Sequence, residues 1–316
     1  MSETGTRQIG IVLVPTFALA SFSMIIEPIR IANRLSGKAL YEWTLLSGDG
    51  GPVASSAGID LQTQAVADLR DKVFDLAMVC AGFHADRYRH AGILNWLRRH
   101  RRLGKDVGAV STGTFILARA GLLDDQRCTV HWDYRGALAE LYPDLNLVDA
   151  LFVIDRGIVT SGGSIAALDL MLRLIADQHG LAFSKAVGEQ FVHSGARVPS
   201  EHQRGDLIHR LGTAKPVLIE AVKRMEGTLD RALSPADIAD ELGISQRQLE
   251  RQFRNQLGRT PVAYHRDLRL DHAKRLLSQT ALPVTEIALS CGFGSASHFA
   301  LLYRQRFGRL PNSDRG

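Results

Sequence analysis

The 316-residue chain carries 38 lysines and arginines against 33 aspartates and glutamates, and 45% of its residues are hydrophobic. This length favours two domains, and this composition is typical of a globular protein with buried cores rather than of a disordered chain. No apolar run reaches the roughly 18 to 20 residues that a membrane-spanning helix needs, and the polar start lacks the layout of a signal peptide. We therefore expect a cytoplasmic protein without membrane contact.

The cysteines and the charge distribution narrow the possibilities further. Cys80, Cys128 and Cys291 are odd in number and lack the spacing of metal ligands, so we expect reduced core thiols, no metal site and no cofactor. Positive and negative residues balance through Leu211, at 22 each, whereas the rest of the chain has 16 positive against 11 negative. A neutral region thus precedes a basic one, which fits nucleic-acid binding but is also common on ordinary solvated surfaces.

The first two thirds of the chain alternate between short apolar runs and amphipathic stretches. Helical patterns at Met24–Arg34 and Ile93–Arg102 lie between apolar runs that are short and rich in β-branched residues. These runs predict buried strands at Ile9–Val14, Tyr41–Ser47, Phe74–Cys80 and Val107–Ser111. The alternation favours an α/β domain with a largely parallel sheet.

The end of this region predicts where a ligand would bind. Leu151–Gly163 has the pattern of a hairpin that turns at Asp155–Gly157, and an apolar helix follows at Ser164–Gln178. In parallel sheets, ligands bind beyond the carboxyl ends of the strands. We therefore expect a site among the loops that follow Cys80 and Ser111 and the loop near Gly162.

A change of pattern suggests the domain boundary. Residues 196–216 mix glycine, proline, serine and charge without sustained periodicity, which favours a linker with at most one helical piece. The prediction is an α/β domain over 1–195, a linker over 196–216 and an all-helical domain over 217–316.

The helical region contains an internal repeat. Leu233–Pro261 can be laid over Leu282–Pro311, with Ile238-Ala239 on Ile287-Ala288 and Leu249 on Phe299. In each copy a short helix is broken at a glycine, and a second helix follows a serine N-cap, which is Ser245 in the first copy and Ser295 or Ser297 in the second. Each copy is therefore predicted to form a helix-turn-helix, and the region is predicted to be all-α with two such units.

The second helix of such a unit places its first turn in the major groove of DNA. Arginine and glutamine side chains form paired hydrogen bonds with guanine and adenine edges. The first copy presents Ser245, Gln246, Arg247, Gln248, Arg251 and Arg254. The second copy has fewer side chains that can read bases, which suits phosphate contacts or loose base readout. Its candidate residues are Ser295, Ser297, His298, Arg304 and Arg306.

The segment between the two copies is predicted to be a rigid spacer helix. It places on one face Tyr264, Leu268, Ala273, Leu276 and Leu277. Two recognition helices joined in this way would enter successive major grooves, roughly 34 Å apart. The alternative is a helical bundle whose surface is basic for other reasons.

These residues carry a resemblance to a known family. Leu233–Arg315 resembles the DNA-binding domain of the AraC/XylS transcription regulators and reproduces nearly the whole family pattern, including Gly258, Pro261 and Gly308. The chain departs from the pattern at Asp314, where the family usually has an aromatic residue.

The front region resembles a second family. Pro15–Gly37, Ser111–Asp125, Cys128–Trp132 and Thr160–Leu172 are similar to the PfpI-like, class I glutamine-amidotransferase-like domain of GlxA-type regulators. This resemblance implies a flavodoxin-like α/β fold, homodimer formation, and a response to small nitrogen metabolites such as arginine, carnitine or glycine betaine. It also implies activation of catabolic genes, with RNA polymerase as a possible partner.

Enzymes related to this domain carry a cysteine where this chain has Ser111, and a serine hydroxyl needs an adjacent oriented base to act as a nucleophile. His131 could approach Ser111, and Glu27 matches an acidic residue that lies near the cysteine of those enzymes. We favour a non-catalytic site in which the unpaired backbone N–H groups of the turn bind a ligand carboxylate and aromatic residues face a cationic head group. The candidate ligand-binding residues are Glu27, Phe83, His84, Ser111, Thr112, Gly113, His131 and Trp132.

Packing offers an alternative for each of these residues, because aromatic side chains are as common in cores as in pockets. The expected function is a DNA-binding transcription regulator with a small-molecule effector. The alternative is an amidase or hydrolase that uses Ser111 and is fused to a DNA-binding domain.

Overall fold

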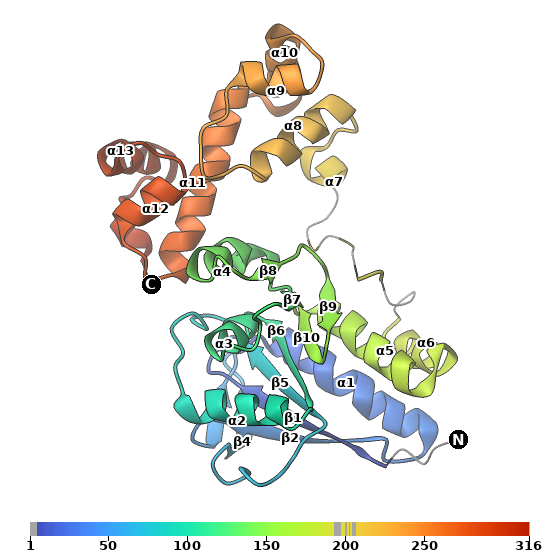
Figure 1. The fold of residues 1–316 in the computed structure, drawn as a ribbon. Coiled ribbons are helices and arrows are strands. Elements are labelled where there is room, and N and C mark those ends of the chain that lie inside the picture. Colours follow the sequence, from blue (N-terminus) through green and yellow to red (C-terminus); the bar gives the residue numbers. More distant parts are fainter. Residues whose placement is uncertain (1–4, 193–196, 200, 202, 204–206, 316) are drawn as a thin grey trace. The chain divides into compact units, whose positions relative to one another are not determined.

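The computed structural model describes residues 5–192, 197–199, 201, 203 and 207–315. The chain divides into two compact units, Met1–Gln203 and Arg204–Gly316 (Figure 1). Positions 196, 200, 202 and 204–206 of the predicted linker lie outside the described residues. Its last part includes a helix, α7 (Leu207–Leu211), in which Leu207 is buried in the core of the second unit.

The first unit contains an eight-stranded sheet with the order β3-β4-β2-β1-β5-β6-β10-β9. Only the two edge pairs, β3–β4 and β9–β10, are antiparallel. The strands are β1 (Arg7–Leu13), β2 (Tyr41–Ser47), β3 (Gly51–Ala54), β4 (Asp60–Ala65), β5 (Leu76–Ala81), β6 (Asp106–Ser111), β9 (Phe152–Asp155) and β10 (Ile158–Ser161). A separate pair is formed by β7 (Arg127–Cys128) and β8 (Asn146–Leu147). The order β2-β1-β5-β6-β10 is that of the flavodoxin-like fold, so the predicted α/β class is confirmed.

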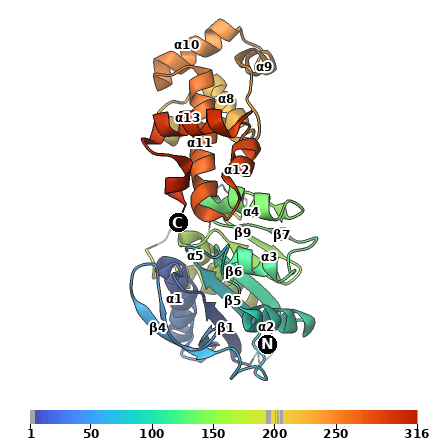
Figure 2. The same cartoon turned by 90° about the vertical axis from the view of Figure 1, so that its left-hand side faces the viewer.

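Helices cover both faces of this sheet. One layer is formed by α1 (Leu19–Ser36), α5 (Ile165–His179) and α6 (Leu181–Glu189), and the opposite face carries α2 (Ala91–Arg102) and α3 (Thr114–Arg119) (Figure 2). The short η1 (Trp132–Tyr134) and α4 (Arg135–Leu141) follow β7. Both faces of β5 are buried, as expected for a central parallel strand.

The second unit is all helical, as predicted. Besides α7 it contains α8 (Pro216–Glu226), α9 (Pro235–Glu241), α10 (Gln246–Leu257), α11 (Pro261–Gln279), α12 (Val284–Ser290), α13 (Ala296–Phe307) and η2 (Pro311–Asp314). The α9–α10 pair lies near one end of α11 and the α12–α13 pair near the other (Figure 1). Each pair is a helix-turn-helix, and α11 is the predicted spacer. Within the described part of the chain, no helix is long and apolar enough to cross a bilayer.

The spacer helix α11 is tied to both pairs by buried polar side chains. Of the predicted apolar face, Ala273, Leu276 and Leu277 are fully buried, while Tyr264 and Leu268 are partly buried against the core of the second unit. The Nε2 atom of His265 lies 2.7 Å from the carbonyl oxygen of Thr228, in the segment that leads into α9. Arg269 donates to the carbonyl of Gly292 at 2.8 Å, in the turn between α12 and α13.

Candidate ligand site and nucleic-acid interface

Ser111 ends β6 in a left-handed backbone conformation, with φ at 59°. A residue with a β-carbon rarely adopts this conformation, and such strain is found at turns whose shape is fixed by their surroundings. Here the surroundings are two loops. The Thr112 hydroxyl donates to the carbonyl of Gly82 at 2.5 Å, and the backbone N–H of His131 donates to the carbonyl of Ser111 at 3.3 Å.

Those two loops carry the predicted aromatic residues. Phe83 and His84 follow Gly82 directly; the Phe83 side chain is 55% exposed, and His84 is exposed as well. On the other side Trp132 is 37% exposed, and its ring centroid lies 5.5 Å from that of His131. The structure therefore gathers these residues around the Ser111 turn, with both large aromatic side chains exposed rather than packed in the core.

Glu27 does not join this cluster. Its carboxylate forms an ion pair with Arg30 at 2.6 Å, on an exposed face of α1. The α1 residue at the turn is Ser21: a β-carbon on Gly163 would lie 2.7 Å from the Ser21 hydroxyl and 2.8 Å from the Ser111 β-carbon. Six helical residues correspond to about 600°, so Ser21 and Glu27 point about 120° apart around the helix.

The backbone donors of the turn differ from expectation in one respect. Gly113 was expected to offer an unpaired N–H group, but this group donates to the carbonyl of Val110 at 3.0 Å. The following helix, α3, has only six residues, so its dipole offers little to an anion. Gly113 has a packing role instead, because a β-carbon there would lie 2.7 Å from the carbonyl oxygen of Val79.

His131 has a defined tautomer. Its Nδ1 atom accepts a hydrogen bond from the backbone N–H of Asp133 at 3.3 Å. Burial lowers the pKa of His131, with a smaller opposite contribution from Asp133, so the imidazole is neutral near pH 7. A neutral imidazole that accepts at Nδ1 carries its proton on Nε2.

A residue missed by the sequence analysis completes the site. The side-chain amide of Gln203 donates from Nε2 to the Val130 carbonyl at 2.9 Å and the Ala150 carbonyl at 2.8 Å, and it reaches the Thr129 hydroxyl at 3.0 Å. Its Oε1 atom accepts from the backbone N–H of Trp132 at 2.9 Å. Gln203 is the last residue of the first unit. No sequence periodicity marks it, since it lies in the aperiodic segment.

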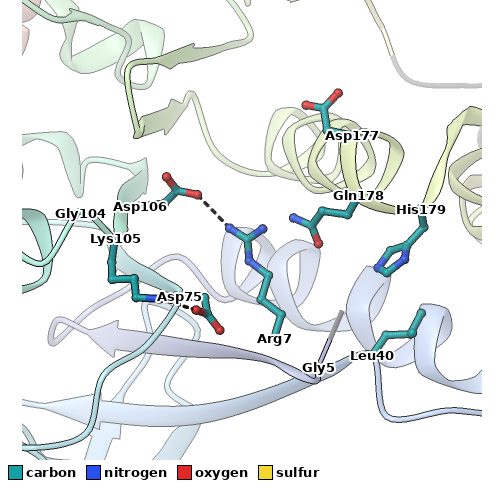
Figure 3. Close-up of a pocket in the computed structure, with 10 residues that line it drawn as sticks. All are labelled: Gly5, Arg7, Leu40, Asp75, Gly104, Lys105, Asp106, Asp177, Gln178 and His179. Atoms are coloured by element: carbon teal, nitrogen blue, oxygen red, sulfur yellow. Dashed lines mark hydrogen bonds and ion pairs between the residues drawn. The ribbon is translucent and has the colours of Figure 1, made fainter. Parts of the chain in front are cut away.

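A separate cavity of about 640 Å³ lies at the opposite, amino-terminal edge of the sheet (Figure 3). Its charged walls are already paired. Arg7 contacts Asp106 at 2.8 Å, and Lys105 contacts Asp75 at 2.8 Å. A charged ligand would have to replace these ion pairs, so we do not assign the effector to this cavity.

In the first helix-turn-helix, Ser245 caps α10 as predicted. Its hydroxyl accepts from the backbone N–H of Gln248, whose side chain accepts in return from the Ser245 backbone. Gln246 donates to Glu250 at 2.9 Å. The side chains free to approach DNA are therefore arginines: Arg247, Arg251 and Arg254 are exposed and form no ion pair within the described residues.

The second helix-turn-helix begins its recognition helix at Ser295 rather than Ser297, because the Ser295 hydroxyl accepts from the backbone N–H of His298 at 3.2 Å. Ser297, His298 and Arg304 are exposed. Arg306 was also expected to face DNA, but it forms an ion pair with Asp271 at 2.7 Å. That guanidinium stabilises the packing of α13 on α11 instead.

A flavodoxin-like unit joined to two helix-turn-helix units on one spacer helix defines a DNA-binding transcription regulator with a fused α/β domain. Comparison with known proteins agrees. Residues 238–316 match the model of a helix-turn-helix domain, and residues 12–177 match that of the DJ-1/PfpI family. The chain belongs to the HTH-type transcriptional regulators that carry a DJ-1/PfpI domain.

Similarity to curated regulators extends over nearly the whole chain. The regulator GbdR of Pseudomonas aeruginosa strain UCBPP-PA14 is 40% identical over 98% of this chain and 84% of its own length. CdhR of P. aeruginosa strain PAO1 is 40% identical over 96% and 90%, and GlxA of Rhizobium meliloti strain 1021 is 39% identical over 97% and 95%.

Solved structures resemble the first unit. An AraC family transcriptional regulator from Pseudomonas putida is 29% identical, with a TM-score of 0.51, over 58% of this chain and 99% of that chain. Oxidised DJ-1 of Toxoplasma gondii is 18% identical, with a TM-score of 0.51, over 60% of this chain and all of that chain. The second likeness concerns the fold alone.

Proposed function

We propose that the first unit binds a small effector at the Ser111 turn and that this binding changes how the second unit engages DNA. The observation that carries the proposal is the junction at this turn. Loops bearing exposed aromatic side chains, Phe83 and Trp132, are hydrogen-bonded to Ser111 and Thr112 from two sides. An exposed aromatic wall beside polar groups suits a ligand that is partly apolar and partly charged.

The effector class is a small nitrogen metabolite, either amino-acid-like or a quaternary ammonium compound. A cationic nitrogen gains from the face of Trp132, and backbone groups of the turn supply polar contacts. Glu27 contributes little to this recognition because Arg30 already neutralises it. A ligand shifts DNA binding only by its differential affinity for the two states of the protein.

Hydrolysis at Ser111 is the rival function, and the tautomer of His131 argues against it. A general base must accept the serine proton at a nitrogen that has none. The Nδ1 atom is engaged with the backbone of Asp133, and Nε2 carries the proton. In this arrangement His131 would be a donor toward Ser111 rather than a base, so we propose a site that binds without catalysing.

Ser111→Ala distinguishes the two functions. Alanine keeps the β-carbon that the left-handed backbone already accommodates, so the variant should fold. A sensor retains DNA binding and changes mainly in effector affinity, whereas a hydrolase loses all turnover. The measurement is a thermal-shift panel of nitrogen metabolites on the full chain, with Ser36→Ala as control, since that hydroxyl donates to the carbonyls of Asn33 and Lys38 and accepts from the Lys38 N–H, all within its own turn. Stabilisation by no metabolite would contradict the proposal.

The remaining parts of this proposal are expectations: homodimer formation through the first unit, activation of catabolic genes and contact with RNA polymerase follow from the resemblance, and a cytoplasmic location follows from the hydropathy of the sequence. Paired DNA-binding modules gain effective concentration, which is the physical advantage of a dimer here.

A further inference from the structure

The side-chain amide of Gln203 is surrounded by hydrogen-bond partners. Its orientation is fixed by its partners, because the Trp132 N–H must face an oxygen, and the carbonyls of Val130 and Ala150 must face a nitrogen. The accepting residues are buried: Thr129 is 1% exposed, Val130 2% and Ala150 5%. The Ala150 carbonyl also accepts from the Thr129 hydroxyl at 3.0 Å, whereas the donor to the Val130 carbonyl is Gln203. A buried carbonyl oxygen without a donor destabilises the fold, so an N–H group is needed beside Val130.

Gly162 makes room for the amide. A β-carbon at position 162 would lie 2.3 Å from the Oε1 atom and 2.4 Å from the Cδ atom of Gln203. Gly162 joins β10 to the Gly163–Ser164 turn that packs on Ser111. The Gln203 amide therefore lies against the residue that directly precedes the turn of the proposed effector site.

The same stretch of chain is held at two further points. The guanidinium of Arg197 donates to the buried carboxylate of Asp169 at 2.8 Å, and the Pro199 carbonyl accepts from the backbone N–H of Leu151 at 3.0 Å. The residue after Gln203 is Arg204, the first residue of the DNA-binding unit. Docking of Gln203 thus fixes the point at which the chain leaves the sensing unit.

We propose that Gln203 is an internal occupant of the effector site, and that an effector carrying N–H groups displaces it and releases the segment leading to the DNA-binding unit. This inference rests on the proposed function and adds the ligand class and the route of regulation. The effector presents an ammonium, guanidinium or amide nitrogen to Thr129, Val130 and Ala150, and a carboxylate or carbonyl oxygen to the Trp132 N–H.

The hydrogen-bond pattern decides between the two effector classes. The buried acceptors need N–H donors, and a primary ammonium offers three of them. A quaternary ammonium has none, so it would leave the Val130 carbonyl without a donor, while the Ala150 carbonyl would keep only the Thr129 hydroxyl, which lies at 3.0 Å. The site therefore favours amino-acid-like effectors over their N-trimethylated counterparts.

Competition predicts the effect of removing the occupant. If the docked form is populated about nine times as much as the undocked form, Gln203→Ala increases effector affinity about tenfold, because the site no longer has to be vacated. Gly162→Ala expels the same side chain by a steric clash but also fills the space that the effector needs. It should release the segment like Gln203→Ala and yet weaken effector binding.

The binding experiment uses the full chain and calorimetry with glycine, 4-aminobutyrate, arginine, and the N-trimethyl forms of the first two. The wild type, Gln203→Ala and Gly162→Ala are compared, with Glu201→Ala as control, since among the described residues its carboxylate accepts from the nearby Val198 N–H and takes no part in the hydrogen bonds of Gln203. The expected result is binding of N–H-bearing compounds, tighter in Gln203→Ala and weaker in Gly162→Ala. Equal affinity in wild type and Gln203→Ala, or preference for the trimethyl forms, overturns the inference while leaving the proposed function intact.

A second readout needs no ligand. The Trp132 amide hydrogen bonds to Gln203, so its hydrogen exchange reports docking directly. Exchange at Trp132 should accelerate in Gln203→Ala and Gly162→Ala but not in Glu201→Ala. Unchanged exchange in both variants overturns the inference even if no compound in the panel binds, whereas accelerated exchange without any binding supports the internal occupant and counts against the proposed function.

Discussion

Arg197 and Asp169 form an ion pair across 28 residues of sequence, in which the carboxylate is fully buried and the Arg197 side chain is 36% exposed. The Asp169 carboxylate, fully buried on α5, accepts from the backbone N–H of Arg197 at 3.0 Å and from its guanidinium at 2.8 Å. Asp169→Asn removes the charge that accepts these hydrogen bonds, while the Arg197 guanidinium left behind can still reach water. Hydrogen bonds to a charged group contribute about 1.5 to 3 kcal/mol, so we expect the substitution to lower the free energy of unfolding of the first unit by about 2 kcal/mol.

Urea denaturation of the full chain measures this loss. Asp177→Asn, on the same helix, removes an exposed carboxylate paired with Arg173 at 2.9 Å and is the matched control. Exposed pairs contribute at most about 1 kcal/mol, so the control should be close to wild type. Equal effects of the two substitutions would show that the Arg197 segment adds nothing to the fold.

The first recognition helix should dominate DNA affinity. Arg247 and Arg251 have Ser297 and Leu301 as their counterparts in the second copy, 50 positions later. We expect Arg247→Ala and Arg251→Ala to weaken binding by about 1 to 3 kcal/mol wherever an arginine reads a base, and Ser297→Ala and Leu301→Ala to cost less.

Fluorescence anisotropy on a duplex selected from a random pool, at several salt concentrations, tests this expectation. Loss of a phosphate contact lowers the salt slope by about one, whereas loss of a base contact relaxes sequence preference. Arg224→Ala, which removes an exposed cation paired with Glu241, is the control. Comparable losses from the two recognition helices would contradict the predicted asymmetry.

Acid should destabilise the second unit through His272. Burial, with a smaller contribution from Arg275, lowers the pKa of His272 from 6.5 to about 4. Below pH 6.5 His272 binds a proton in the unfolded chain but not in the folded one. The free energy of unfolding therefore decreases as the pH is lowered, and it levels off below about pH 4. The full loss is up to about 3 kcal/mol. Urea unfolding at pH 7.5 and pH 5 should show about 2 kcal/mol of this loss, and His272→Gln should flatten the profile.

The cysteines should be unreactive in the native protein. Cys80, Cys128 and Cys291 are all buried, and burial raises the pKa of the Cys128 thiol to about 11. Burial also raises the pKa of Cys80 well above its usual range. Since the thiolate is the reactive form, iodoacetamide should modify the unfolded chain but not the folded one at pH 8. Rapid native modification would place a thiol at the surface.

The sequence predicted those features that depend on local pattern. Buried central strands such as β5 are continuous apolar runs, and the Ser245–Gln248 capping box is a local signal. The hairpin of β3 and β4 was missed because its strands lack the regular apolar residues that mark a strand with one buried face. In Asp60–Ala65 no residue is buried. Sequence periodicity also gives no sign that polar residues such as His265 and Arg269 are buried, because their partners come from other helices.

The candidate site was predicted in outline. The predicted loops after β5, β6 and β10 do meet, as the topology of a parallel sheet requires, whereas the loop after β7 comes from the separate two-stranded pair. Ser21 was missed because its contact depends on the rotation of α1, and Gln203 because it reaches the site from 53 positions beyond Ala150. Asp314, where the chain differs from the usual family pattern, lies in the final helical turn η2. Its carboxylate accepts a hydrogen bond from the Tyr303 hydroxyl at 2.5 Å, which holds this turn against α13.

The hydrogen bond that Arg269 donates to Gly292 constrains the spacing of the half-sites in a promoter. Because it bonds α11 to the turn before α13, the separation of the two recognition helices is a property of the protein, and the double helix must match it. One inserted base pair displaces the second half-site by about 3.4 Å and rotates it around the axis. Mutations that lengthen or shorten an operator should therefore silence it more thoroughly than most base changes within it.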